Sequence, residues 1–347
     1  MTNIKHYIAS LVLLLSFLSI SNLHAQDIHY TQFTLQGMQQ SPAFAGNFDG
    51  NHRFATLYRN QWATVSVPYN TLGFSYDVNI LESKKFQSYF ATGGQSFFDQ
   101  AGDGRLRTFY LQLPVSYSLF VPINEKLNMK LGAGLGLALV NKSLNTSQLQ
   151  FDNQYTGVFF DPTIPIAENF DNLQFTRPDL SIGSQIGLII KEKTSLGMAF
   201  GLHHLNNIQE SFIDDGRSIQ LARRLALPAY IQFPLTPQWE LRFDYLHQVQ
   251  RTLSEHTFGA LAKYYLKNDG PAQTSISFGS YYRWKDAISG IVRYQKNNWL
   301  FAFSYDSNVS PLRAATNSYG GIEIGAVYII KKVEEPQIKY KRKCIVF

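Results

Sequence analysis

Apolar and polar residues alternate with a period of two along most of the chain after about residue 53. Between Thr71 and Leu81, for example, apolar side chains occupy every second position from Leu72 to Ile80, and small or polar residues lie between them. Successive side chains of a strand point to opposite faces, so this pattern predicts strands with one apolar and one polar face. The pattern recurs at 109–119, 127–137, 239–245, 299–305 and 322–330.

Turn-forming residues divide this region into fourteen predicted strands. We place them at 53–66, 70–82, 86–98, 105–121, 126–141, 179–191, 194–206, 222–234, 238–249, 252–267, 272–284, 287–296, 298–308 and 318–331. Most exceed the roughly five or six residues usual in soluble sandwiches and are long enough to cross a bilayer at a tilt. An open sheet edge would leave backbone groups unpaired in lipid. We therefore predict an all-β fold, a transmembrane antiparallel β-barrel of about 14 strands.

The connections between these strands are alternately short and long. The long ones include Lys142 to Pro178, Asn207 to Leu221 and Val309 to Asn317. Outer-membrane barrels have short periplasmic turns and longer outer loops. Because the strand number is even, both ends of the chain are expected in the periplasm.

Two N-terminal segments precede the predicted barrel at 52–331, and a basic C-terminal tail at 332–347 follows it. Residues 1–25 have a basic start, an apolar run and a small residue at a cleavage site, which predicts a cleaved signal peptide. The alternative, a retained anchor, needs a longer apolar run of roughly 20 residues. The loop-like segment 26–51 is expected at or inside the periplasmic mouth, either with a role in assembly or as a lead-in without function.

Composition agrees with a protein whose surface does not all face water. Aromatic residues make up 14% and charged residues only 16%, below the roughly 25% usual in soluble domains. The net charge is +6, but residues 331–343 alone hold six basic and two acidic side chains, so the charge is a tail and not a nucleic-acid groove. Candidate tail contacts to an acidic envelope partner are Lys341, Arg342, Lys343 and Phe347. The alternative is that the charges only keep the chain end out of the membrane.

No set of residues predicts catalysis, a cofactor or a metal site. His203 and His204 are adjacent in a predicted strand, so they are expected on opposite faces, where they would not chelate one metal. Gly132, Gly134 and Gly136 alternate within a strand and are expected to make room on the lumen face. Asp99 and Asp103 could bind calcium, but an exposed polar hairpin is the simpler interpretation.

Several stretches resemble the PorP/SprF family of the type IX secretion system of Bacteroidetes, a system linked to protein secretion and gliding motility. They are "QDIHYTQFTLQGMQQSPAFAG" (26–46), "LYRNQW" (57–62), "GMAFGLHHLNN" (197–207) and "SYDSNVSPLRAATNSYGGIEIGAVYII" (304–330). The motif positions, taken as structural or partner-contact residues, are Pro42, Gly46, Arg59, Asn60, Trp62, His204, Asp306, Gly320 and Gly321. In the strand at 53–66, Arg59 is expected to face the lumen, where it could pair with Asp77 or Asp306, and Trp62 to face lipid or an aromatic girdle.

The resemblance implies a non-enzymatic outer-membrane barrel that acts in export or cell-surface anchoring of a secreted client through the client's C-terminal domain. It also implies contacts with other type IX secretion components or periplasmic proteins and with outer-membrane lipid, and none with nucleic acid. A long outer loop with Phe151, Tyr155, Phe159 and Phe160 is the candidate contact surface. Its alternative is a loop folded inward as a plug. The alternative function is a channel for small solutes, while an outer-membrane hydrolase lacks a nucleophile and base.

Overall fold

The computed structural model describes residues 27–63, 67–83, 87–168, 170, 172–190, 194–212, 220–269, 272–311 and 313–331. The predicted signal peptide and the basic tail, with Lys341, Arg342, Lys343 and Phe347, lie outside the described residues.

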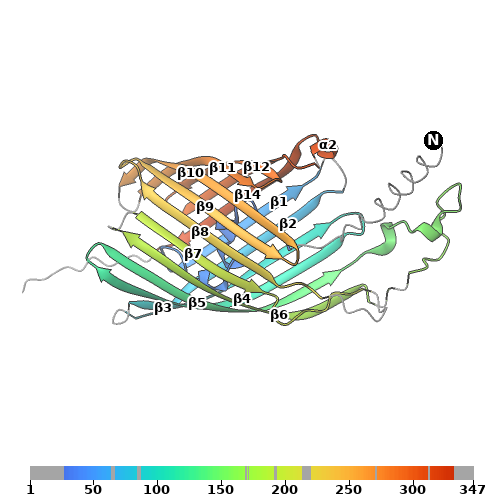
Figure 1. Ribbon diagram of the computed structural model, residues 1–347, viewed down its shortest axis with the longest axis horizontal. Coiled ribbons are helices and arrows are strands. Elements are labelled where there is room, and N and C mark those ends of the chain that lie inside the picture. The colour runs from blue at the N-terminus through green and yellow to red at the C-terminus, as the bar shows by residue number, and fades with distance from the viewer. Residues whose placement is uncertain are drawn as a thin grey trace, which may run out of the picture.

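Fourteen antiparallel strands form a closed barrel, in which each strand pairs with its neighbours in sequence and β1 pairs with β14 (Figure 1). The strands are β1 (His52–Gln61), β2 (Tyr69–Ser83), β3 (Ser88–Ala101), β4 (Leu106–Asn124), β5 (Leu127–Ser143), β6 (Gln174–Ile190), β7 (Thr194–His203), β8 (Arg224–Pro234), β9 (Trp239–Gln250), β10 (Leu253–Asp269), β11 (Ala272–Arg283), β12 (Ala287–Lys296), β13 (Trp299–Asn308) and β14 (Tyr319–Ile330). The predicted fold and strand number are confirmed. None of the helices in the described part of the chain is long and apolar enough to cross a membrane.

Several predicted strand boundaries differ from the structure by three or more residues, and three of them are informative. β1 ends at Gln61 and β7 at His203 because the next residues, Trp62 and His204, have φ angles of 57° and 60°, which turn the chain out of the extended conformation. β6 begins at Gln174, five residues before the predicted start, and pairs with the end of β5. At this end β6 therefore extends beyond β7, whose pairing with β6 stops at Ile182 (Figure 1).

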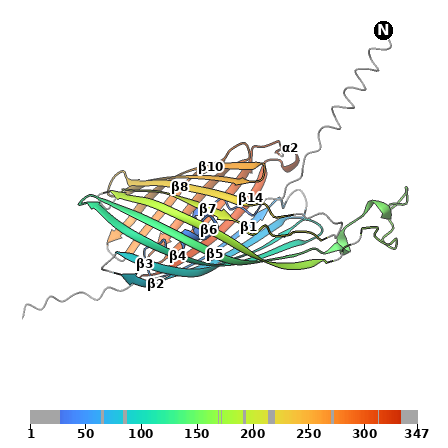
Figure 2. The ribbon, with the colours of Figure 1, turned by 60° about the horizontal axis from the view of Figure 1, so that its bottom comes forward.

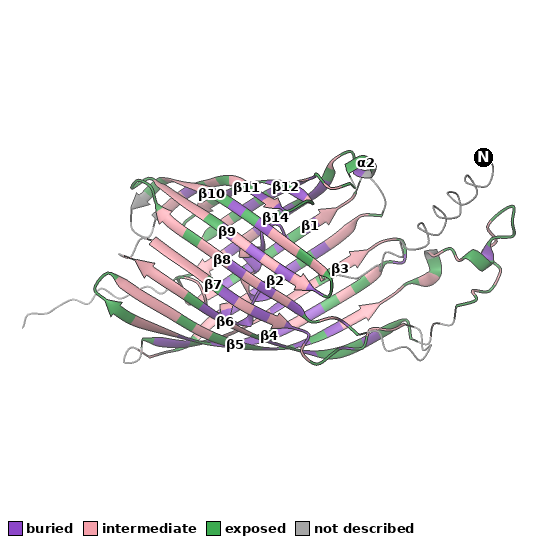
Figure 3. Ribbon diagram, in the orientation of Figure 1, coloured by how far each residue is buried: buried purple, intermediate pink, exposed green. Residues whose placement is uncertain are grey.

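The alternation of side chains separates an apolar outer face from a closely packed interior (Figure 3). On β2, Leu72 and Phe74 are about half exposed, whereas Ser75 and Asp77 between the outward positions are fully buried. On β13, Phe301 and Phe303 point outward in the same way. An apolar outer band around a closed barrel is the surface that hydrocarbon requires.

The lumen is filled by the chain that precedes β1. We call residues 27–51 the plug; it contains two short 3₁₀ helices, η1 (Phe33–Gln39) and η2 (Pro42–Phe44), and lies within the barrel (Figures 1 and 2). Its first residue, Asp27, bonds to His204 beyond the end of β7. Its last, Asn51, donates its N–H to the carbonyl of Ile330 at the end of β14. The plug therefore spans the barrel from the end that carries the long loops, the long-loop end, to the opposite, short-turn end.

This path bears on two expectations about the lumen. The segment was expected at or inside the periplasmic mouth; its described residues lie inside the lumen and extend farther than the mouth, from Asn51 at the short-turn end to Asp27 at the long-loop end. The connection between β5 and β6 was a possible inward-folded plug. Its described residues instead project away from the barrel (Figures 1 and 2).

Candidate functional site

Three glycines on adjacent strands let the plug backbone lie directly against the barrel wall. Gly134, Gly183 and Gly201 are register partners on β5, β6 and β7. A Cβ atom at Gly134 would come 2.5 Å from the backbone nitrogen of Ala43, and one at Gly201 would come 1.9 Å from the carbonyl oxygen of Gln40. Any larger side chain would therefore displace the plug. The expectation that β5 glycines make room on the lumen face is confirmed.

Apolar side chains bind the plug on the opposite side of the lumen. Phe33 packs in one buried cluster with Leu246, Leu261, Tyr281 and Ile291. Tyr30 and Leu35 pack in a second cluster with Ala55, Leu57, Ala302 and Val327. Exposing these inward-facing apolar side chains to a water-filled lumen would be unfavourable, and the plug covers them.

A charge network ties the plug to the seam where β1 meets β14. Arg59 of β1 and Glu323 of β14 are register partners and form a buried ion pair. Arg59 Nη2 also lies 2.9 Å from Asp306 Oδ2 on β13. All three side chains are almost completely buried. Such charges require close partners, since an unpaired charge in this environment is very costly.

Two plug residues complete this network. The hydroxyl of Thr31 donates to both carboxylate oxygens of Asp306, at 2.8 and 2.7 Å. The backbone N–H groups of Thr31 and Gln32 donate to the two oxygens of Glu323, at 2.6 and 2.9 Å. The buried carboxylates are thus bonded by the barrel and by the plug together, so withdrawal of the plug would leave them short of donors.

Asp77, the other predicted partner of Arg59, pairs with Arg53 instead. Its Oδ1 accepts from Arg53 Nε at 2.8 Å, and its Oδ2 accepts from the backbone N–H of Gly46 at 2.8 Å. Gly46 has a φ angle of 72°, and a Cβ there would come 2.3 Å from Asn79 Oδ1. Gly46 therefore suits both the left-handed turn and the tight space where the plug leaves the lumen.

At the long-loop end, the plug begins in a second ionic cluster. His204 lies between two carboxylates, with Nε2 2.7 Å from Asp27 Oδ2 and Nδ1 2.9 Å from Asp179 Oδ2. Burial alone would lower the pKa of His204, but Asp27 and Asp179 raise it to about 9. Burial would raise the pKa of Asp27, but His204 and Arg224 hold it well below its usual range. At neutral pH this anchor therefore holds an ionised carboxylate against two cations.

Two side-chain orientations differ from the sequence prediction. His203 and His204 are both buried in the lumen, because the positive φ of His204 breaks the strand alternation on which opposite faces depended. Trp62 follows the end of β1 and lines a cavity in the lumen with Tyr69; it does not continue the lipid face of the strand. Within the described residues, no group of three or more His, Cys, Asp or Glu side chains could hold a metal ion.

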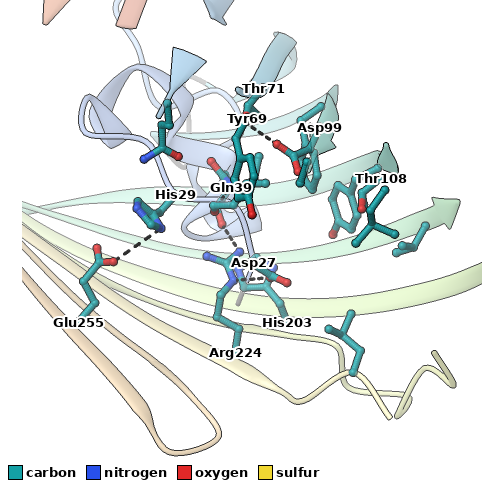
Figure 4. Close-up of a pocket in the computed structure, with 18 of the residues that line it drawn as sticks. Asp27, His29, Gln39, Tyr69, Thr71, Asp99, Thr108, His203, Arg224 and Glu255 are labelled. Carbon is teal, nitrogen blue, oxygen red and sulfur yellow. Dashed lines mark hydrogen bonds and ion pairs between the residues drawn. The ribbon is translucent and has the colours of Figure 1, made fainter. Parts of the chain in front are cut away.

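A cavity of about 500 Å³ lies above the plug at the long-loop end (Figure 4). We call it the vestibule. Asp27, His29 and Gln39 of the plug contribute to its lining. The wall contributes residues from the starts of β2, β4, β8 and β10 and from the ends of β1, β3, β5, β7, β11 and β13. Burial and the charges of Arg283 and Arg59 lower the pKa of His29 well below its usual value, so its ring is neutral beside Glu255. A cavity of this size is in the range of small-ligand sites.

The family model for "Type IX secretion system membrane protein PorP/SprF" matches residues 22–328, which is most of the chain. The protein belongs to the PorP/SprF family. It is therefore a membrane barrel of type IX secretion, and its closed, even-numbered antiparallel sheet places it in the outer membrane. A comparison with curated protein sequences gives no match.

Solved structures that are similar to this PorP/SprF protein include three hydrocarbon transporters. The Ralstonia pickettii toluene transporter TbuX has 14% identity and a TM-score of 0.43, with 84% of this chain and 92% of that chain covered. The CymD monoaromatic hydrocarbon channel has 15% identity, a TM-score of 0.45 and coverages of 86% and 94%. The Pseudomonas putida toluene transporter TodX has 11% identity, a TM-score of 0.40 and coverages of 87% and 93%.

The stretches that resemble the PorP/SprF family meet in space around the plug. Arg59 and Asp306 come from two of them, and Glu323, which the sequence analysis did not single out, comes from the same stretch as Asp306. Gly320 allows β14 to approach β13, since a Cβ there would lie 2.6 Å from the carbonyl oxygen of Asp306. A Cβ at Gly321 would lie 3.0 Å from the carbonyl oxygen of Asn60 on β1. Glu323 could have been found from its inward position in an otherwise apolar alternating strand.

The remaining motif positions lie in or beside the plug. Pro42 starts η2, and its carbonyl carbon lies against Gly134. Ser41 caps this helix, with its hydroxyl accepting from the N–H of Ala43 and donating to the carbonyl of Phe200. The stretch that resembles the family's opening thus includes the plug residues that lie against Gly134, Gly183 and Gly201, which we call the glycine cradle.

Proposed function

We propose that this barrel works in type IX secretion as a closed, non-enzymatic platform at which a secreted client is exported or anchored through its C-terminal domain. The observation that carries the proposal is the plug, whose residues 30–45 bond to the wall through glycine contacts, two apolar clusters and a buried charge network. A lumen filled in this way favours a role as an assembly platform for the secreted client over a role in steady solute conduction.

The lengths of the connections support an orientation for the barrel. We place the long-loop end outside the cell and the short-turn end in the periplasm, as in other outer-membrane barrels. The vestibule and the β5–β6 connection would then face the secreted client. Residues 332–347 would follow β14 into the periplasm, where their basic cluster would be available to another envelope component.

The β5–β6 connection is the proposed contact surface for the client. Its tip is ordered by its own bonds, with Gln154 Nε2 donating to the carbonyl of Ile164 at 2.9 Å and an isolated bridge between Tyr155 and Phe160. Phe151 packs against Phe170 inside the loop. Tyr155 and Phe159, by contrast, are 57% and 60% exposed. An ordered tip that displays aromatic side chains suits recognition of a partner.

Replacing both exposed aromatics tests this surface. We expect Tyr155→Ser with Phe159→Ser to reduce client display on the cell surface at least about tenfold, the loss expected from removing two interface anchors, while barrel assembly stays normal. Display is measured by surface labelling of the client, and barrel level by immunoblot of the outer membrane. The matched control is Val309→Ser, which removes an exposed apolar side chain from another connection at the same end.

Unchanged client display in the double variant would reject the loop as the contact surface. It would leave the closed lumen as a separate claim, to be tested by conductance.

A further inference from the structure

The vestibule contains more hydrogen-bond acceptors than its own donors satisfy. Asp99 of β3 accepts a hydrogen bond from Thr71 at 2.6 Å and has no basic partner within ion-pair distance among the described residues. The sequence analysis placed this carboxylate in an exposed hairpin; instead it lines the vestibule (Figure 4). Glu255, on the opposite side, accepts a hydrogen bond from the Thr257 hydroxyl at 3.2 Å and lies 3.8 Å from the neutral ring of His29.

Two buried amides add to this excess. Gln39 of the plug and Gln112 of β4 both line the vestibule and are 4% and 0% exposed. The side-chain oxygen of each has no hydrogen-bond partner. Buried acceptors without donors are uncommon in folded proteins, and a ligand that supplies donors would satisfy them.

The cations around the vestibule already have partners. Arg224 Nε lies 2.9 Å from Asp27, Arg283 Nε lies 2.5 Å from Asp286, and Lys142 pairs with Glu210. His204 is held between its two carboxylates. Among the described carboxylates that line the vestibule, Asp99 and Glu255 are therefore the ones with no lysine or arginine within ion-pair distance.

Aromatic rings lie on the Asp99 side of the same cavity. Trp62 and Tyr69 are in contact, with ring centroids 4.9 Å apart, and Phe97 stacks on Tyr110 at 5.1 Å. All four line the vestibule. Aromatic faces beside a carboxylate attract organic cations, whose charge interacts with the ring quadrupole and whose methylene groups pack on the rings.

We propose that the vestibule is a binding site for an alkylammonium or guanidinium group, with Asp99 as its principal counter-ion. Such a group is rich in donors and cationic, and its alkyl stem matches the aromatic side of the cavity. It can come from a lysine or arginine side chain of a protein segment that enters from the long-loop end, or from a free polyamine. The site does not depend on the loop contact proposed above.

The test measures binding to the full-length purified barrel in detergent, with Trp62 and Trp284 in the vestibule wall as fluorescent reporters. The probes are a short capped peptide with one arginine, the same peptide with citrulline, which is neutral and of similar shape, and spermidine. We expect the arginine peptide or spermidine to bind and the citrulline peptide to bind at least about tenfold more weakly. Binding of the arginine peptide indicates a protein source, and binding of spermidine alone indicates a free polyamine.

The binding test is repeated with Asp99→Asn, which keeps an oxygen for the Thr71 hydroxyl but removes the negative charge. We expect it to weaken binding about ten- to a hundredfold. The control is Asp103→Asn, which removes an exposed carboxylate from the adjacent turn. Circular dichroism and thermal unfolding verify that both variants fold as the unmodified chain does. Equal affinity for the arginine and citrulline peptides, no binding of any probe, or undiminished binding by Asp99→Asn would overturn the proposal.

Discussion

At the scale of the residue, Arg59 has the largest expected effect on stability. It is one of the largest fully buried side chains, and it forms ion pairs with both Asp306 and Glu323. We expect Arg59→Gln to lower the free energy of unfolding by about 3–5 kcal/mol, because it leaves buried carboxylates with too few cations. Unfolding in urea, followed by tryptophan fluorescence, measures the loss.

Tyr58→Phe is the matched control for Arg59→Gln. Tyr58 is the preceding residue but points outward, where its hydroxyl donates to Asn70. We expect a change below about 1 kcal/mol. Equal losses from the two substitutions would show that the network contributes little.

The anchor between Asp27 and His204 predicts a pH dependence. The pKa of His204 is raised to about 9 in the fold, so the stabilisation is complete below its usual value of 6.5 and is lost as the pH rises through about 9. The pKa of Asp27 is lowered, so its contribution is present above 3.8 and is lost at more acidic pH. Hydrogen-exchange protection of residues 27–32 should therefore fall between pH 8 and pH 10.

His204→Gln is the control for this titration. Its protection at pH 7 should be lower than in the unmodified chain, and it should not show the additional fall near pH 9. A fall of the same size in both proteins would assign the change to another group.

Individual residues also show where sequence reasoning stops. The sequence predicts Asp77 or Asp306 as the partner of Arg59, and the structure pairs Arg59 with Asp306 and also with Glu323. Trp62 and His204 could not be oriented, because strand alternation ends where φ turns positive and the sequence does not give that angle. Glu323 lies across the seam between the first and last strands, and no local pattern encodes that register.

At the scale of the element, the strands were predictable and the plug contacts were not. Each strand faces lipid on one side and the packed interior on the other. Its apolar and polar side chains therefore alternate with a period of two, which is visible in the sequence. The plug has no comparable period. Its position depends on contacts with Gly134, Gly183 and Gly201, whose spacing identifies room on the lumen face but not the segment that occupies it.

The glycine cradle predicts the effect of a single added methyl group. In Gly134→Ala the new Cβ would lie 2.5 Å from the backbone nitrogen of Ala43, so the plug must shift. We expect a loss of about 1–3 kcal/mol in unfolding free energy and reduced hydrogen-exchange protection at 40–45. Gly290→Ala on β12 is the control, because nothing lies within 4 Å of its added Cβ. Unchanged protection at 40–45 in Gly134→Ala would contradict the close contact.

At the scale of the whole molecule, the plug and the seam depend on each other. The strands that close the barrel, β1 and β14, present Arg59 and Glu323 inward, and the plug supplies the remaining donors through Thr31 and Gln32. Closure of the barrel and filling of its lumen therefore share one set of buried charges. A molecule built in this way suits a platform with client-facing loops better than an open channel.

Ion conductance in planar bilayers tests this account most directly, with the full-length barrel compared with a variant that lacks residues 27–45. The account predicts that the full-length protein is closed at moderate voltage and that the deletion produces a steady open pore. Gly134→Ala, which loosens the plug without removing it, should open more often than Gly290→Ala and serves if the deletion variant does not assemble. Steady conductance by the full-length protein, equal to that of the deletion variant, would contradict the closed lumen and favour a channel for small solutes.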